Sequence, residues 1–214
     1  MDKGRKDSMA SKGKNQMYIG VKSKDVKKAS HFAGIKKIKE VYSGKNFPGC
    51  SCPPVHLVTL DLSKFDCFSP EIQKMGKLPV VYSNCEACDA WMMEGEDNDA
   101  EMYFKIKDHK LSPVNPKSYT DCCDEGESEP PEEYFGIDFI TYKKGDKAEW
   151  YAVYVGGEPE WVQGYDSWAV CPECEEAMDY AARVRAVRFG CGDQDLYIFV
   201  CAECSTMGMT MQCT

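Results

Sequence analysis

Four cysteines in the second half of the chain stand in two pairs with the spacing of metal ligands. Cys171 and Cys174 form the first pair, and after 26 further residues Cys201 and Cys204 form the second. A Cys-x-x-Cys turn presents two sulfur atoms on one side, and two such turns brought together supply four thiolates at tetrahedral positions. The segment between the pairs can be long, because lengthening a loop adds little to the entropic cost of closing it. We therefore predict a zinc site at these four cysteines.

Two other interpretations of this pattern stay open. Cys171 and Cys174 could form a redox dithiol, which usually follows a strand and opens a helix, and residues 175–184 ("EEAMDYAARV") could be that helix. The four cysteines could instead be buried thiols without a ligand. The matched pair at Cys201 and Cys204, and a third Cys-x-x-Cys pair earlier in the chain, favour metal binding over both.

The first half of the chain carries a similar but less regular set. Its cysteines are, in order, Cys50, Cys52, Cys85 and Cys88, with 32 residues between the two pairs. Only one residue separates the first two cysteines, which is one too few for the usual turn, so His56 or Cys67 could replace one of them as a ligand. The cofactor prediction is therefore one zinc ion at the second set and a further zinc ion at the first.

The two cysteine sets lie in stretches that resemble one another. In the first half "FPGCSC" precedes "LPVVYSNCEAC", and in the second half "AVCPEC" precedes "DLYIFVCAEC". In both, a run rich in β-branched and aromatic residues leads into the second cysteine pair. This register indicates an internal duplication, with one half at 29–120 and the other at 134–214.

Apolar runs of strand-like composition recur along the chain. They lie at 55–62, 78–83, 101–108, 139–142, 149–157 and 195–201, and 17–21 could add a short strand. At 101–108 the apolar residues alternate, with Met102, Phe104 and Ile106 on one face. Short helices are expected near 65–75. The predicted fold class is therefore α+β and mainly β, in two pseudo-repeated halves that each carry a zinc-ribbon-like cysteine site.

Two charged segments flank and divide these halves. Residues 1–28 are rich in Lys, Ser and Gly and predict a disordered basic tail. Residues 121–133 contain seven acidic residues and two prolines, which is typical of an exposed loop or linker. We expect the two halves to form one compact unit.

Charge is distributed unevenly along the chain. Residues 1–40 contain 12 Lys or Arg and 4 Asp or Glu, a net charge of +8, whereas the remainder contains 14 and 31, a net charge of −17. An acidic body repels nucleic acid and favours a basic partner. We therefore expect a protein or peptide partner, and nucleic acid only through the basic tail.

The composition also bounds the compartment and the reaction class. No apolar run is long enough to span a membrane, and the basic N-terminus lacks the apolar core of a secretory signal. These features place the protein in the cytoplasm or the nucleus, where its 13 cysteines stay reduced. The three histidines and the scattered carboxylates form no recognisable catalytic set, which argues against an enzyme.

A second distinctive stretch, "GGEPEWVQ" at 156–163, suggests a contact surface. Gly156 and Gly157 permit a tight turn, and Pro159, Trp161 and Gln163 follow them. Tryptophan anchors many protein interfaces. These five residues are therefore the candidates for binding a partner, although a Gly-Gly turn beside a core tryptophan would give the same pattern.

The chain from about residue 30 to its end resembles the YwqG-like proteins. The stretches "SHFAGIKKI" and "FPGCSCPPVHLVTLDL" are similar to the opening motifs of that family, and "GGEPEWVQ", "CPECEEAMDYAARV" and "DLYIFVCAEC" are similar to its later part. Related domains occur in the programmed-cell-death-protein-2 proteins, which have paired Cys knuckles and act as chaperones of a small-subunit ribosomal protein. The resemblance implies a fold more than an activity.

Together these features predict a non-enzymatic, zinc-binding interaction module that acts as a chaperone or adaptor on a protein or peptide segment. Trp161 would anchor the partner, and the two glycines and Pro159 would shape the turn. Two alternatives stay open: an immunity-type protein that neutralises a toxin by steric blockade, and a thiol-disulfide oxidoreductase at Cys171 and Cys174.

Overall fold

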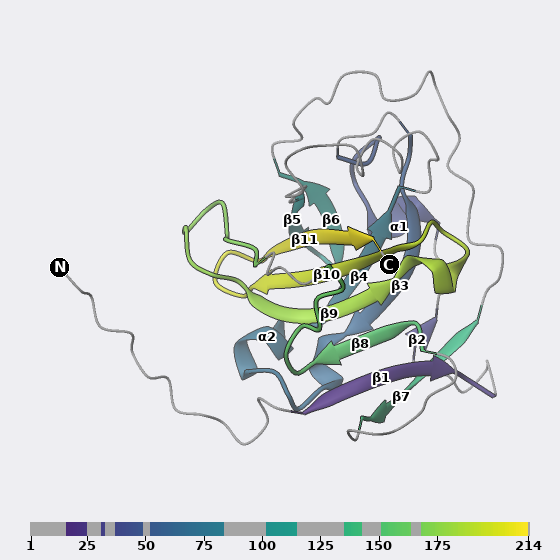
Figure 1. Cartoon of the computed structure of the whole chain (residues 1–214). Helices are drawn as coiled ribbons and strands as arrows, with labels where there is room; N and C mark the ends of the chain where they lie inside the picture. Colours follow the sequence, from purple (N-terminus) through teal and green to yellow (C-terminus); the bar gives the residue numbers. More distant parts are fainter. Residues whose placement is uncertain are drawn as a thin grey trace.

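The chain folds around one large antiparallel sheet (Figure 1). The computed structural model describes residues 16–24, 31–32, 37–48, 52–83, 102–114, 135–142, 151–163 and 168–213. Within these residues nine strands form a sheet in the order β2-β7-β1-β8-β9-β10-β11-β5-β6, and β3 and β4 form a separate pair. Every pairing between these strands is antiparallel.

Strands make up most of the described secondary structure. The large sheet contains β1 (Met17–Lys22), β2 (His31–Phe32), β5 (Met102–Lys107), β6 (Lys110–Pro113), β7 (Gly136–Thr141), β8 (Val153–Gly156), β9 (Asp179–Arg185), β10 (Gln194–Cys201) and β11 (Thr206–Cys213). The smaller pair consists of β3 (Val55–Asp61) and β4 (Lys77–Tyr82). The helices are α1 (Ile38–Val41) and α2 (Pro70–Lys74), with 3₁₀ turns η2 (Leu62–Lys64) and η3 (Ala186–Phe189). None of the described helices has the length and hydropathy that a membrane crossing requires.

The strands expected from apolar runs are present. The runs at 55–62, 78–83, 101–108 and 195–201 correspond to β3, β4, β5 and β10. The short helix α2 lies within the stretch 65–75 where helices were expected, and its first residue is Pro70, which suits a helix start because its missing N–H has no partner there in any case. The mainly β fold class is therefore confirmed.

The structure does not show two pseudo-repeated halves. Strands β1, β2, β5 and β6 come from the first 120 residues, yet they pair within the same sheet as β7 to β11. The spacing of the cysteines had suggested a repeat. Any four-cysteine site built from two Cys-x-x-Cys turns has this spacing, so the spacing alone is no evidence of an internal duplication.

Residues 179–185 form strand β9, so the helix considered for 175–184 is wrong. Ala182 and Val184 face the main core, while Arg183 and Arg185 alternate with them on the other face. The alanines of this segment suit a helix as well as a strand, and the pairing of β9 with both β8 and β10 decides between them.

Strand β1 occupies the interior of the sheet, between β7 and β8. Its Ile19 is 1% exposed and pairs with Ile140 on β7 and Tyr154 on β8. Residues 17–22 therefore belong to the sheet, as the run "MYIGV" suggested, and not to the basic tail. Residues 1–15 and the acidic segment 121–133 lie outside the described residues.

The main core lies between the large sheet and the β3–β4 pair, which Figure 1 shows behind the sheet. Leu57 and Leu60 of β3 and Val184 and Ile198 of the sheet are all fully buried in it. Each such side chain stabilises the fold by about 1.5–3 kcal/mol. Strand β3 is buried on both faces, which explains why its sequence "VHLVTL" is mostly apolar and does not alternate regularly between apolar and polar residues.

Gly156 ends β8 against the side chain of Cys67. Gly156 and Gly157 have φ angles of 71° and 72°, in the left-handed region that favours glycine. A Cβ atom on Gly156 would lie 2.5 Å from the Cys67 Sγ and 2.9 Å from the carbonyl oxygen of Gln16. Burial also raises the pKa of the Cys67 thiol to about 12, so this cysteine stays protonated and acts as a small packing group.

We expect Gly156→Ala to lower the free energy of unfolding by about 1–3 kcal/mol, because alanine is strained at this φ and overlaps Cys67. Urea denaturation measures the change. The control is Glu158→Ala, an exposed position in the same loop, which should change stability by less than about 0.5 kcal/mol. Equal stabilities of the Gly156→Ala protein and the parent would contradict the close contact.

Candidate metal centre

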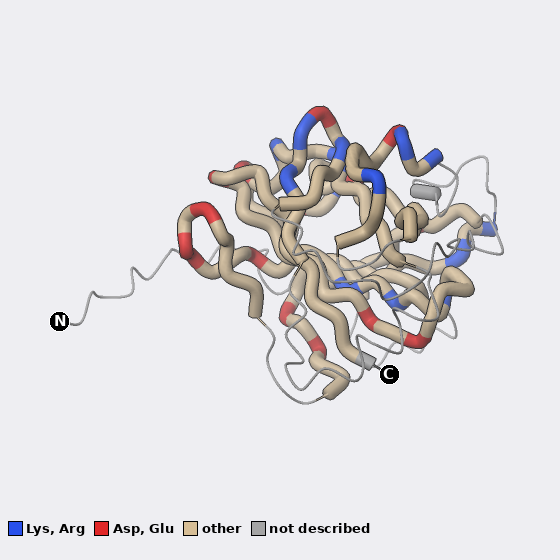
Figure 2. Tube along the Cα trace, turned by 90° about the horizontal axis from the view of Figure 1, so that it is seen from above, with Lys and Arg blue, Asp and Glu red and all other residues tan. Residues whose placement is uncertain are grey.

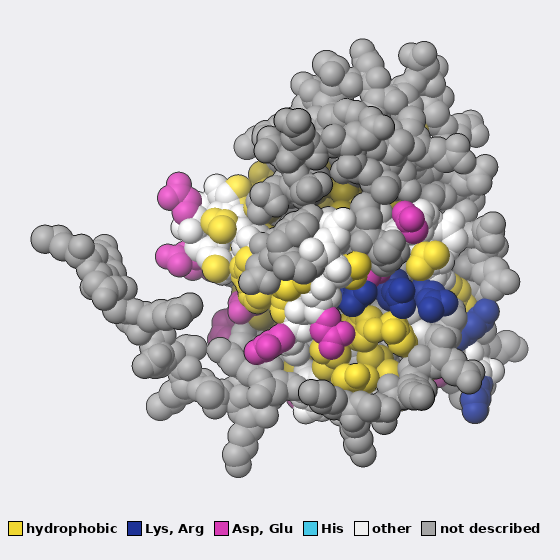
Figure 3. Space-filling view, viewed as in Figure 1, with side chains coloured by type: hydrophobic (Ala, Val, Ile, Leu, Met, Phe, Trp, Pro, Cys, Tyr) yellow, Lys and Arg dark blue, Asp and Glu magenta, His cyan; other side chains and the backbone are white. Residues whose placement is uncertain are grey.

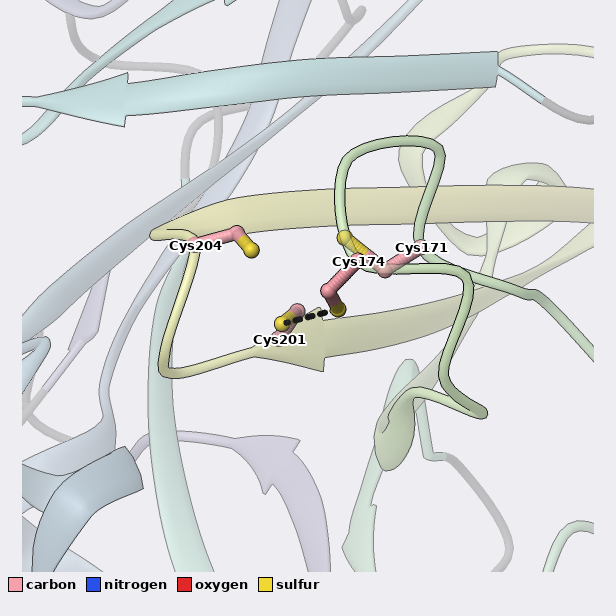
Figure 4. Close-up of side chains that lie close together, drawn as sticks. All are labelled: Cys171, Cys174, Cys201 and Cys204. Atoms are coloured by element: carbon pink, nitrogen blue, oxygen red, sulfur yellow. Dashed lines mark hydrogen bonds between the residues drawn. The ribbon is translucent and has the colours of Figure 1, made fainter.

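The four cysteines of the second set meet at one end of the large sheet. Their Sγ atoms all lie within 4.8 Å of one another. The Sγ atoms of Cys174 and Cys201 are 3.8 Å apart. Tetrahedral coordination with Zn–S bonds of about 2.3 Å places the sulfurs about 3.8 Å apart. Figure 4 shows the four side chains converging on a common centre, so the cluster has the size to hold one metal ion.

A tight turn before β9 positions the first pair. The Cys171 amide donates a hydrogen bond to the Glu176 carbonyl at 2.9 Å, and the Glu175 amide donates to the Cys171 carbonyl at 2.9 Å. These bonds close the turn, so that Cys171 and Cys174 present their sulfurs to the same side. Glu175, directly after the pair, has a left-handed φ of 59°.

The hairpin between β10 and β11 positions the second pair in the same way. Cys201 ends β10 and pairs with Thr206 of β11, and Cys204 lies in the turn between them. Ser205, directly after the pair, has a left-handed φ of 50°. Both turns therefore use a left-handed residue at the same position, although neither residue is the glycine that would have indicated it from the sequence.

Gly208 lets the first turn approach β11 closely. A Cβ atom at this position would lie 3.0 Å from the Met178 Sδ and 3.1 Å from the Ala169 Cβ, which are the residues flanking the first turn. The glycine thus brings the two Cys-x-x-Cys turns together, a role that the sequence pattern did not indicate.

An ion pair ties the two turns to each other. The Lys105 Nζ on β5 donates to both carboxylate oxygens of Glu173, at 2.6 Å each, and also to the Cys204 carbonyl. The Thr206 Oγ1 donates to the same carboxylate at 2.7 Å. These bonds, first from Lys105 and then from Thr206, lower the pKa of Glu173. The first turn, through Glu173, is therefore held against the second.

The four thiols influence one another's pKa values. Burial acts to raise the pKa of Cys171, but amide N–H groups of the turn and the neighbouring thiols outweigh it and lower that pKa. The pKa values of Cys201 and Cys204 are raised, first by loss of solvation and then by nearby thiols. One thiolate therefore discourages ionisation of the others, and a divalent cation would favour ionisation of all four.

A small aromatic cluster connects the cysteines to the stretch "GGEPEWVQ". Cys171 is buried in this cluster with Tyr197 and Phe199, and Trp161 packs against it. The Trp161 ring lies 4.6 Å from the Tyr197 ring and 6.2 Å from the Phe199 ring, between centroids. Trp161 is thus half-buried on the outer face of the sheet, the face opposite the main core.

Hydrogen bonds fix the backbone of this stretch on the sheet. The Tyr197 hydroxyl donates to the Glu160 carbonyl at 2.7 Å. The amides of Val162 and Gln163 donate to the Gln212 Oε1 at 2.8 and 3.1 Å. The structure therefore places Trp161 beside the cysteine cluster and leaves Val162 and Gln163 exposed. Gly156, Gly157 and Pro159 lie at the start of the same loop.

Two exposed residues near the cluster were missed by sequence reasoning. Trp168 is 43% exposed and Val170 is 46% exposed, and both come just before the first cysteine pair. The Trp168 Nε1 donates to the Met178 carbonyl at 2.9 Å, and its ring lies 5.5 Å from Phe199. The sequence "SWAV" before Cys171 could have indicated this surface, because it places two large apolar residues directly before the cysteine turn.

The first cysteine set is described only in part. Cys52 is fully buried in the main core, whereas Cys50, Cys85 and Cys88 lie outside the described residues. His56 is buried in β3, and its Nε2 lies 2.9 Å from the Thr59 Oγ1, as expected for a core histidine. A metal site in the first half therefore stays a prediction.

We expect Lys105→Met to weaken zinc binding about 10- to 100-fold, because it removes the cation that holds Glu173 and the Cys204 carbonyl together. Competition with a coloured zinc chelator measures the affinity. The matched control is Lys107→Met, an exposed lysine on the same strand, which should leave the affinity unchanged. An unchanged affinity in Lys105→Met would show that the ion pair does not support the site.

Comparison of the chain with protein-family models, with curated proteins and with solved structures finds no match in any of the three. The resemblance to YwqG-like proteins therefore stays a prediction. Statements about what the site can bind rest on the positions of its residues alone.

Proposed function

We propose that this protein is a non-enzymatic interaction module whose binding surface is held in place by a zinc ion at Cys171, Cys174, Cys201 and Cys204. The observation that carries the proposal is the convergence of four thiols directly beside an exposed apolar surface. Four protein ligands fill a tetrahedral ion and leave no position for a substrate, which is typical of structural sites and not of catalytic ones.

The donor set favours zinc among the metals. All four candidate ligands are sulfur, which suits Zn²⁺ and iron in tetrahedral geometry and disfavours magnesium and calcium. Zinc needs no redox chemistry and binds thiolates firmly in a reducing compartment such as the cytoplasm. The four ligands lie on two separate turns, so the ion would link them and add folding free energy directly.

The surface beside the cluster supplies the contact chemistry. Trp168, Val170 and Val162 are exposed apolar residues, and Trp161 lies among them. Exposed acidic residues lie in the same two segments, at Glu160, Glu175 and Glu176, and Figure 2 shows acidic residues on the loop that carries the first cysteine pair. Figure 3 shows apolar side chains gathered on this face with acidic ones at their border. The partner would therefore be a protein segment with apolar and basic residues.

Such a segment suits a chaperone or adaptor, the role that the resemblance to programmed-cell-death-protein-2 domains implies. An immunity-type protein would use the same surface but bind a single toxin tightly. The oxidoreductase alternative loses its main support, because the first cysteine pair leads into strand β9 and not into a helix.

Metal analysis of protein purified without added metal tests the first part of the proposal. We expect one zinc per chain, with the four cysteines of the cluster protected from alkylation until chelation. Two zinc ions would add the predicted site at Cys50, Cys52, Cys85 and Cys88. Cys201→Ser should lose the metal, whereas Cys191→Ala, a buried cysteine outside the cluster, should keep it. Metal-free protein with rapidly alkylated Cys171 would overturn the proposal and favour the oxidoreductase.

Peptide binding tests the second part. The probes are synthetic peptides of equal length and apolar content whose polar residues are Lys, Gln or Glu. We expect the Lys peptides to bind, and Val170→Ser to weaken them about tenfold without loss of metal. The matched control is Val187→Ser, because Val187 is 45% exposed in the turn η3, which follows the end of β9 away from the cysteines. Equal loss in both variants, or no preference for Lys peptides, would contradict the assigned surface.

A further inference from the structure

Arginine is used at one place in the described fold. The chain has four arginines against 22 lysines, and three of the four are Arg183, Arg185 and Arg188. A guanidinium differs from an ammonium in its planar fork, which holds carboxylate or phosphate oxygens through two hydrogen bonds and stacks on aromatic rings. The clustering of arginine on β9 and the following turn therefore indicates that these positions use the planar, two-pronged hydrogen bonding or the ring stacking that lysine cannot provide.

Arg183 is fully engaged by the protein itself. Its Nε donates to the Asp195 Oδ2 at 2.7 Å, its Nη2 contacts the same oxygen, and its Nη1 donates to the Glu160 carbonyl at 3.2 Å. The guanidinium lies between the rings of Tyr154 and Tyr197, at 5.3 and 5.8 Å from their centroids. Arg183 is therefore a structural residue that supports the loop of Trp161.

Arg185 shares the same carboxylate but is not satisfied by it. Its Nε lies 3.5 Å from the Asp195 Oδ1, too far for a normal hydrogen bond. Both of these atoms are buried, and neither has a hydrogen-bond partner within the described part of the chain. Asp195 is fully buried between two guanidinium groups, so one negative charge faces two positive ones. The Arg185 guanidinium also lies 5.2 Å from the Tyr151 ring centroid.

Arg188 adds a second incompletely satisfied guanidinium. Its Nε is buried and has no hydrogen-bond partner among the described residues. Arg188 lies in the 3₁₀ turn η3, for which Arg185 is the N-cap residue. Arg185 and Arg188 are therefore only three residues apart, one at the end of β9 and the other in the turn that follows it. Figure 3 shows a row of basic side chains across this face, next to apolar ones.

We propose that Arg185 and Arg188 bind an oxyanion, the carboxylate or phosphate group of a ligand, at the end of β9 away from the cysteine cluster. The oxyanion would accept hydrogen bonds from the two guanidinium groups and balance the excess positive charge beside Asp195. The acidic body of the chain repels extended polyanions, which favours one isolated anionic group over a nucleic-acid backbone. This site is independent of the metal centre and of the peptide surface.

Titration of the full-length zinc protein by NMR, observed at the arginine Nε–H groups, tests the proposal. The probes are inorganic phosphate and, separately, acetate. We expect saturable shifts at Arg185 and Arg188, and little change at Arg183, whose Nε–H is bound to Asp195, or at Arg5, which reports non-specific effects of salt. Tighter binding of phosphate would identify a phosphate-bearing ligand, and tighter binding of acetate a carboxylate.

Arg185→Lys and Arg188→Lys keep the charge but remove the planar fork. Each should reduce the affinity for the better probe at least about tenfold, while zinc content stays at the parent value. If Arg185→Lys does not fold, Arg188→Lys alone provides the test, because Arg188 makes no contact with Asp195 that the structure records. No saturable response to either anion, or a response at Arg5 equal to that at Arg185, would overturn the proposal.

Discussion

Strand β10 is the element on which the rest of the structure depends, because it pairs with both β9 and β11 and is buried on both faces. One face sends Leu196 and Ile198 into the main core. The other sends Tyr197 and Phe199 under Trp161 and the first cysteine turn. Its last residue, Cys201, is itself part of the sulfur cluster. Core packing, the aromatic cluster and the candidate metal site are therefore all set by one strand and its two neighbours.

The outer face of the sheet changes in character along β9 and β10. Near the cysteines it is aromatic, and toward the far end it carries the ion pair of Arg183 and Asp195. A buried ion pair of this kind contributes little net stability, because desolvation offsets the attraction. Its clearest effect is positional, since Arg183 also holds the Glu160 carbonyl and with it the loop that carries Trp161.

The four cysteines of the site were predictable from the sequence. The spacing of Cys171, Cys174, Cys201 and Cys204 is that of two metal-binding turns, and few other structures require cysteines at this spacing. Most strands were predictable for a similar reason: β3 and β10 are long apolar runs whose burial leaves few alternatives. Strand β9 was not, because Ala181 and Ala182 carry no β signal and the neighbouring strands determine its conformation. The Lys105–Glu173 pair and Gly208 were not predictable either, since they depend on which distant strands become neighbours.

The indole of Trp168 is held by the carbonyl of Met178 and by Phe199, which belong to the two elements that carry the cysteines. The exposed apolar surface is therefore positioned by the same elements that position the sulfur cluster. If the protein has the function proposed above, a partner that binds this surface in the zinc-bound form would bind the metal-free form less well. Thermodynamic reciprocity then requires the partner to tighten zinc binding by the same factor by which zinc tightens partner binding. In the proposed function, a bound partner would therefore keep the metal on the protein at lower zinc concentrations than the free protein needs.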